Sequence, residues 1–218
     1  MEHNDASFLI SQKLSSADKS RFLILESPYR CKYDFARTRG VVSEWLDGEL
    51  INWGSVKATL PVRSTISVDY FECLIVEGGQ SNVIEIGFAT SYSDLEYGFD
   101  WYNGGVGYRG SNGRIYKGRT NVDKQNLQIV KFNTDDIIGA GMNVKKEEIF
   151  FTKNGELIEN LKLIQQNETW FPTIRLHSKG AIVEANFGKS AFSYDLGKYD
   201  IYKHIIIFIL DDYYNEQR

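Results

Sequence analysis

Short stretches of alternating apolar and polar residues follow one another along most of the chain. In the run DYFECLIVE, Phe71, Cys73 and Ile75 are two residues apart and would therefore share one face of a strand. Alternation over this length predicts strands rather than helices. The predicted strands are 21–27, 32–36, 40–45, 55–60, 69–77, 82–90, 97–101, 106–110, 137–144, 147–153, 170–176 and 181–187.

Turn-forming dipeptides separate these runs at short intervals. The strongest signal is Asn154-Gly155, because both residues tolerate the positive φ of a type I′ turn and apolar runs flank them. Many short strands with frequent turns are typical of all-β domains, so we expect an antiparallel β-sandwich. The other turn signals are Asp47-Gly48, Gly78-Gly79, Asn103-Gly104-Gly105 and Asn112-Gly113.

The pattern divides the chain into three parts. Residues 1–20 are polar and predict a loosely ordered lead-in, residues 21–197 predict the sandwich, and residues 198–218 predict a C-terminal extension. Within the extension, 205–210 is so uniformly apolar that both a helix and a docked edge strand remain open. Residues 160–167 have the composition for one or two turns of helix.

Composition and charge exclude several classes of function. The 218 residues carry a formal net charge of −4, which argues against a nucleic-acid-binding protein. The longest apolar run, 205–210, is far shorter than the roughly 20 residues of a membrane-spanning helix. The N-terminus lacks the pattern of a secretory signal, which favours the cytosol or nucleus. We therefore expect Cys31 and Cys73 to be buried, reduced thiols.

The sequence gives little support to an enzyme. Of His3, His177 and His204, only His177 lies within the predicted sandwich, and a triad needs a histidine beside its nucleophile. No spacing of cysteine and histidine is typical of zinc sites, and no phosphate-binding loop motif is present. Glu85 and Asp100 form one carboxylate pair to check, since paired carboxylates hydrolyse glycosides. We expect neither catalysis nor a cofactor.

Several motifs in order resemble one family. DYFECLIVE, IEIGFAT, VGYRGSNG, DDIIGAGMNVKKEEIFFTKNGELI, WFPTIRL and AIVEANFGKSAFSYDL are similar to the successive strands of a SPRY domain, over about residues 53–197. Within that family, VKATLPV and FFTKNGELI resemble the Ran-binding-protein-M group. The resemblance implies a concanavalin-like jelly-roll sandwich that binds short peptide segments of partner proteins. Members of this group also carry LisH and CTLH helical segments and act as scaffolds in ubiquitin-ligase assemblies.

The resemblance also implies a loop-lined peptide site. Lys57 stands where the Ran-binding-protein-M group usually has an arginine, and Thr59-Leu60 replaces an Asn-His pair, so peptide specificity need not be shared. Tyr108 corresponds to an aromatic pocket floor, and the cationic residues would favour an acidic or carboxamide-rich ligand. The implied site residues are Lys57, Thr59, Pro61, Asn82, Tyr108, Arg109, Arg175, His177 and Ser178.

Two alternatives stay open beside the interaction module. A carbohydrate-binding or glycan-processing sandwich would need a concave face with an aromatic residue such as Trp101 near paired carboxylates. A structural or oligomerisation domain would act through the apolar segment 205–210. Each reading predicts protein, peptide or glycan partners rather than nucleic acid or membrane.

Overall fold

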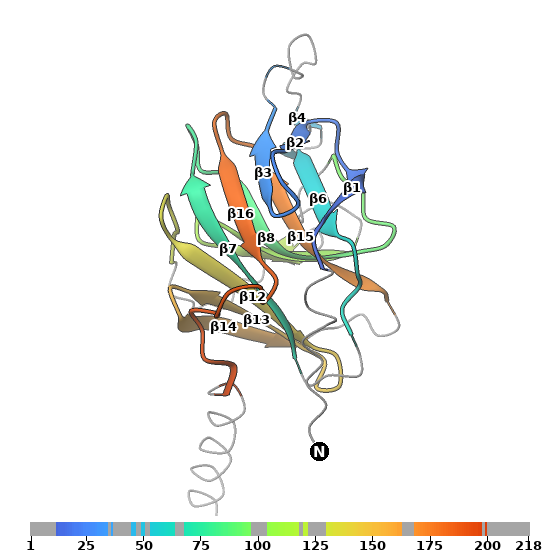
Figure 1. The fold of residues 1–218 in the computed structure, drawn as a ribbon, viewed down its shortest axis with the longest axis vertical. Helices are drawn as coiled ribbons and strands as arrows, with labels where there is room; N and C mark the ends of the chain where they lie inside the picture. Colours follow the sequence, from blue (N-terminus) through green and yellow to red (C-terminus); the bar gives the residue numbers. More distant parts are fainter. Residues whose placement is uncertain are drawn as a thin grey trace, which may run out of the picture.

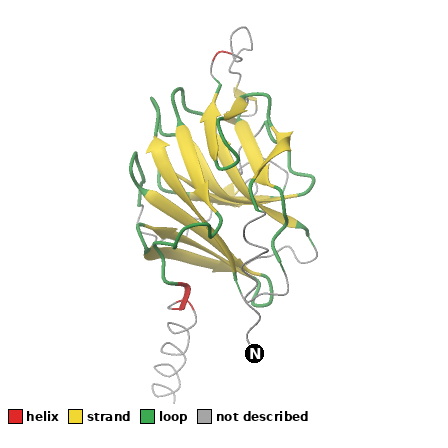
Figure 2. Ribbon diagram, in the orientation of Figure 1, coloured by secondary structure: helices red, strands yellow, loops and turns green. Residues whose placement is uncertain are grey.

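The computed structural model describes residues 12–34, 36, 45–46, 49–50, 53–63, 68–96, 104–117, 120–121, 130–162, 168–197 and 199. Two antiparallel sheets lie face to face (Figure 1), and strands make up most of the ribbon (Figure 2). The antiparallel β-sandwich predicted from the sequence is thereby confirmed. No helix in the described part of the chain has the length and apolar character needed to cross a membrane.

One sheet, here named the β8 sheet, contains seven strands among the described residues. Their order across the sheet is β1 (Leu14–Lys19), β6 (Gly54–Ala58), β15 (Trp170–Leu176), β8 (Ile84–Thr90), β9 (Gly105–Arg109), β10 (Ile115–Lys117) and β11 (Thr120–Asn121). 

The second sheet, named the β7 sheet, also has seven strands in the described ranges. Their order is β14 (Glu156–Lys162), β13 (Glu148–Lys153), β12 (Ile137–Asn143), β7 (Asp69–Glu77), β16 (Ile182–Asn186), β3 (Arg30–Tyr33) and β2 (Leu23–Leu25). A separate small hairpin pairs β4 (Trp45–Leu46) with β5 (Glu49–Leu50).

The hydrophobic core lies between the two sheets. Phe71, Cys73 and Ile75 of β7 point inward, as their spacing predicts, and Phe71 contacts Phe88 of β8 with the ring planes nearly perpendicular. Cys31 and Cys73 are both free and fully buried, which confirms the expectation of reduced core thiols. Burial in this apolar layer raises the pKa of each thiol.

The hairpin at Asn154-Gly155 is confirmed. Strands β13 and β14 pair with Lys153 opposite Glu156, and Asn154 and Gly155 have φ values of 51° and 80°. Because β14 runs to Lys162, residues 160–162 are strand rather than the helical turn predicted for 160–167. The rest of that segment, 163–167, lies outside the described residues.

The structure differs from the sequence prediction at the N-terminal end of the sandwich. Residues Leu14–Lys19 form β1 beside β6, whereas the sequence predicted loose order through residue 20. At the other end, Tyr199 is buried against Phe150 with a ring-centroid distance of 4.4 Å. The predicted strands at 40–45 and 97–101 and the apolar run 205–210 fall largely or wholly outside the described residues.

Candidate functional site

The structure does not gather the nine predicted site residues into one surface. Because β6 and β15 are antiparallel, Gly54 lies opposite Leu176, and His177 and Ser178 follow at the same end of the sandwich. Thr59 and Pro61 follow β6 at the opposite end, where Val62 donates its N–H to the carbonyl of Trp170. Asn82 precedes β8 at the His177 end, and the other predicted residues lie on the outer face of the β8 sheet or inside the core.

Lys57 and Arg175 are buried on the outer face of the β8 sheet, each only 1% exposed. The Lys57 ammonium donates to the carbonyl of Ser91 at 2.9 Å. Arg175 donates to the carbonyl of Asp94 at 2.9 Å and to the hydroxyl of Ser93 at 2.7 Å. Two cations from neighbouring strands therefore hold the loop that follows β8 by its backbone.

Burial lowers the pKa of Lys57, and the neighbouring Arg175 lowers it further, whereas Asp18 and Asp94 oppose the shift. The nearest of these carboxylates belongs to Asp18, 3.8 Å from the ammonium. Lys57 is thus an internal anchor for residues 91–94, and its charge faces the loop rather than solvent.

Arg109 lies at the other side of the same face, where a carboxylate and two aromatic rings of the described residues contact it. Its guanidinium contacts the buried carboxylate of Glu85 at 2.6 Å and lies over the rings of Tyr116 and Trp53, with centroid distances of 3.9 and 5.3 Å. The Trp53 ring also lies 5.4 Å from the ring of His177. Glu85, which the sequence offered as half of a glycosidase pair, is therefore engaged by Arg109, while Asp100 lies outside the described residues.

Tyr108 lies in the core and not on a loop surface. Its side chain is fully buried, its ring packs against Phe132 and Phe151, and its hydroxyl donates to the carbonyl of Val130. Burial raises the pKa of the Tyr108 hydroxyl. In this position the residue supports the loop around residue 130 from inside, and it cannot floor an open pocket without leaving the core.

Three loops meet at the end of the sandwich that carries Asn82, His177 and Ser178. We name this surface the loop platform, made of residues 78–83, 130–136 and 177–181. Ser178 accepts the N–H of Ser81 on its hydroxyl at 3.0 Å, and Gln80 donates its N–H to the carbonyl of Lys179 at 3.0 Å. Gly79 has a φ of 70°, and a side chain there would meet the Lys179 carbonyl oxygen at 2.6 Å. Two of the loops are therefore held in close backbone contact.

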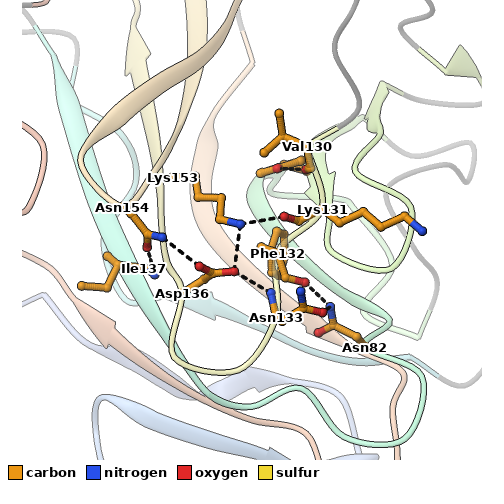
Figure 3. Close-up of polar contacts among 10 residues, drawn as sticks. Asn82, Val130, Lys131, Phe132, Asn133, Asp136, Ile137, Lys153 and Asn154 are labelled. Atoms are coloured by element: carbon orange, nitrogen blue, oxygen red, sulfur yellow. Dashed lines mark hydrogen bonds and ion pairs between the residues drawn. The ribbon is translucent and has the colours of Figure 1, made fainter.

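Asn82 joins the third loop to the other two. Its amide nitrogen donates to the carbonyl of Phe132 and, at 3.4 Å, to the side-chain oxygen of Asn133 (Figure 3). Its φ of 50° is a left-handed conformation that asparagine tolerates better than most residues. Asn82 thus positions the platform, as the short polar residue that this turn requires.

Asp136 completes the platform beside the β13–β14 hairpin (Figure 3). Its carboxylate accepts the N–H of Asn133 at 2.7 Å and the side-chain amide of Asn154 at 2.8 Å, and it lies 3.0 Å from the Lys153 ammonium. Burial by itself raises the pKa of Asp136, but these hydrogen bonds and the ammonium outweigh it, so the pKa lies below its ordinary value.

The solvent side of the platform carries polar side chains and charges of both signs, with Asp135 as an exposed carboxylate. His177 is partly exposed beside the rings of Trp53 and Tyr33, and Lys131, Asn133 and Lys179 are exposed. The sequence analysis missed the last three. Lys179 directly follows Ser178, which was a usable signal, whereas Lys131 and Asn133 approach Asn82 only in the fold. Chemically, the platform offers hydrogen-bond donors, two exposed ammonium groups, one exposed carboxylate and one imidazole.

Comparison with known proteins agrees with this architecture. The family model of the SPRY domain matches residues 68–190. The chain is 31% identical over 147 residues to the Ran-binding protein M homolog of Arabidopsis thaliana, and 29% identical over 145 residues to Ran-binding protein 9 of Xenopus tropicalis. These alignments cover 67% and 66% of this chain but only 31% and 26% of the two relatives.

Solved structures show the same fold. A human SPRY domain superposes with a TM-score of 0.60 at 23% identity, covering 78% of this chain and 98% of its own. The SPRY domain of human HERC1 superposes with a TM-score of 0.63 at 16% identity, covering 82% and 99%. Together with the matched family model, the sandwich described above establishes that this chain belongs to the SPRY-domain family.

Proposed function

We propose that this chain is a non-catalytic protein-interaction module that docks short peptide segments of partner proteins on the loop platform. The observation that carries the proposal is the set of hydrogen bonds that fixes three loops, from distant parts of the chain, at one end of a rigid sandwich. Loops positioned by a rigid scaffold are the usual carriers of recognition in β-proteins. A preformed surface also loses little conformational entropy when a ligand binds.

The predicted residues take different parts in this proposal. His177 contacts the peptide, together with the exposed Lys131, Asn133 and Lys179. Asn82 and Ser178 position the loops, and Lys57, Arg175 and Tyr108 support the surrounding structure from inside. The exposed ammonium groups of Lys131 and Lys179 outnumber the exposed carboxylate of Asp135, so the platform favours a peptide rich in carboxylates or carboxamides by charge complementarity.

We extend the proposal to a larger assembly on the basis of the relatives. The chain spans about a third or less of the length of the Ran-binding proteins that it resembles. In such a setting the module docks a partner or substrate for a ubiquitin-ligase scaffold inside the cell. The two buried thiols, Cys31 and Cys73, suit a reducing compartment.

A peptide-display screen on the 218-residue chain tests the peptide surface. We expect a consensus with acidic or carboxamide residues, and we expect binding to weaken about tenfold in His177→Ala or Lys179→Glu, as for contact residues near the centre of an interface. Pro61→Ala, at the opposite end of the sandwich, is the matched control. Absence of any consensus contradicts the proposal, and loss of binding in Pro61→Ala alone would move the site to the other end.

A further inference from the structure

A separate pocket lies on the outer face of the β7 sheet. Leu74 of β7 stands between Ile137 of β12 and Glu184 of β16, each directly opposite it in the strand register. Leu74 is 38% exposed, and its neighbour Ile137 is partly exposed. The pocket above this row has a volume of about 290 Å³. Its floor is therefore apolar and its side toward β16 is acidic.

The segment 187–194 closes the pocket on one side, and its position is fixed. The carboxylate of Glu72 accepts the N–H groups of Ser193 at 2.9 Å and Tyr194 at 3.0 Å. Asn186 accepts the N–H of Ser190 at 3.2 Å and donates to the carbonyl of that residue at 3.0 Å. Since both ends of the segment are hydrogen-bonded to the sheet or its exit, the pocket is preformed.

The charged side chains around the pocket leave the Glu184 carboxylate able to contact a ligand. Its side chain is 50% exposed, and within the described part of the chain its ionic contact is a 3.4 Å approach of an Arg30 nitrogen. Arg30 also contacts Glu26, at the shorter distance of 3.0 Å. Lys189, the cation of the pocket lining, has its ammonium over the Tyr29 ring, 5.2 Å from the centroid.

We propose that this pocket binds a lysine or arginine side chain of an extended partner segment. The aliphatic stem of such a side chain would lie on Leu74 and Ile137, and its charge would reach Glu184, which is how long cationic side chains combine apolar and charged contacts. The volume is just below the range of about 300–1,000 Å³ of small-molecule sites, so one side chain is the fitting occupant. The pocket lining contains two carboxylates, of Glu72 and Glu184, and one ammonium, of Lys189. This balance of charge disfavours an acidic side chain as the occupant.

The test is an NMR titration of the isotopically labelled 218-residue chain with three capped tripeptides, Ala-Arg-Ala, Ala-norleucine-Ala and Ala-Glu-Ala. We expect saturable shifts of the Leu74, Glu184 and Ala191 amides with the arginine peptide, weaker effects with norleucine and none with glutamate. Added salt should weaken the arginine effect, because exposed charges are screened.

Four variants sharpen the test. We expect Glu184→Gln to weaken arginine-peptide binding about two- to fivefold, the range of an exposed ion pair. Lys189→Ala should strengthen it, because a competing cation is removed, and Leu74→Ser should abolish it. Leu157→Ser is the matched control, since Leu157 is 39% exposed on β14 and is no part of the pocket lining.

Three results would overturn the proposal: no shift at these amides, equal shifts with the glutamate peptide, or unchanged binding in both Glu184→Gln and Leu74→Ser. Thermal unfolding of each variant checks that the fold is retained. Because the pocket and the loop platform share no residues, His177→Ala should leave this titration unchanged, and either proposal can fail alone.

Discussion

Glu85 and Arg109 face each other across the paired strands β8 and β9, with a guanidinium nitrogen 2.6 Å from a carboxylate oxygen. Glu85 is fully buried, and the Arg109 side chain is 11% exposed. The pair therefore lies largely outside the screening of solvent, and the rings of Tyr116 and Trp53 cover the guanidinium. The attraction between the two charges offsets the desolvation cost of burying each of them.

Removing one partner should be costly. We expect Arg109→Ala to lower the free energy of unfolding by about 3–5 kcal/mol, because it leaves the Glu85 carboxylate buried without its cation. The double variant Arg109→Met with Glu85→Leu should recover much of that loss. Urea denaturation measures both, and a single variant as stable as the wild type contradicts this account.

Tyr108 provides a second test, which separates support from ligand contact. Tyr108→Ala should lower the free energy of unfolding by about 3–5 kcal/mol, the cost of deleting a large buried side chain. Tyr108→Phe keeps the ring and loses the hydrogen bond to the Val130 carbonyl, which should lower the free energy of unfolding by about 1 kcal/mol. We expect Tyr108→Phe to bind any platform peptide as the wild type does. A tenfold loss of binding with unchanged stability would show direct contact instead.

Lys57 predicts an unusual pH dependence. Its pKa in the folded protein is lowered by burial, so the unfolded chain binds the proton more tightly. Below the folded pKa, the buried Lys57 is charged and its full desolvation cost lowers the free energy of unfolding. This cost is relieved as the pH rises from the folded pKa to the ordinary lysine pKa, because the folded protein then loses the proton. Relative to Lys57→Met, the wild type should therefore gain stability as the pH rises from 7 toward about 10. Urea denaturation across this range checks the sign, and a flat difference contradicts it.

Asp136 predicts the opposite slope in acid. Its folded pKa lies below the ordinary carboxyl value, so its contribution to stability is complete above that value and is lost as the pH falls through the folded pKa. Asp136→Asn should thus be less stable than the wild type at pH 7, and the difference should shrink below about pH 4. Thermal unfolding at a series of pH values measures this difference. If the difference in stability between the wild type and Asp136→Asn grows in acid, the Asn154 and Lys153 contacts are not its cause.

The strands with regular alternation were predictable from the sequence, and the others were not. DYFECLIVE coincides with β7 and WFPTIRL with β15, because every second residue enters the core. The strand β1, with the sequence LSSADK, carries little apolar signal and is held by its backbone pairing with β6. Such a strand depends on a partner distant in sequence.

The site residues were harder to predict for a similar reason. Lys57 and Arg175 look like exposed cations until the loop 91–94 is placed over them, and that is a contact over more than 30 residues of sequence. Tyr108 did carry a local signal, since Val106 and Tyr108 are two apart and share the inward face, with Gly105 and Gly107 on the other. The resemblance identified the fold correctly, but it did not distinguish a supporting side chain from a contacting one.

The anchoring of the loop 91–94 has a consequence for how such a domain diversifies. Lys57 and Arg175 reach the carbonyl oxygens of Ser91 and Asp94, and every amino acid carries a carbonyl. Of these three contacts to the described loop residues, the one to the Ser93 hydroxyl depends on which residue is present. The side chains at positions 91 and 92 can thus change in evolution while these two backbone anchors keep their geometry, whereas the Asp94 carboxylate also accepts the N–H of Glu96 at 2.8 Å. Tyr92, which is 54% exposed, occupies the position with the widest freedom.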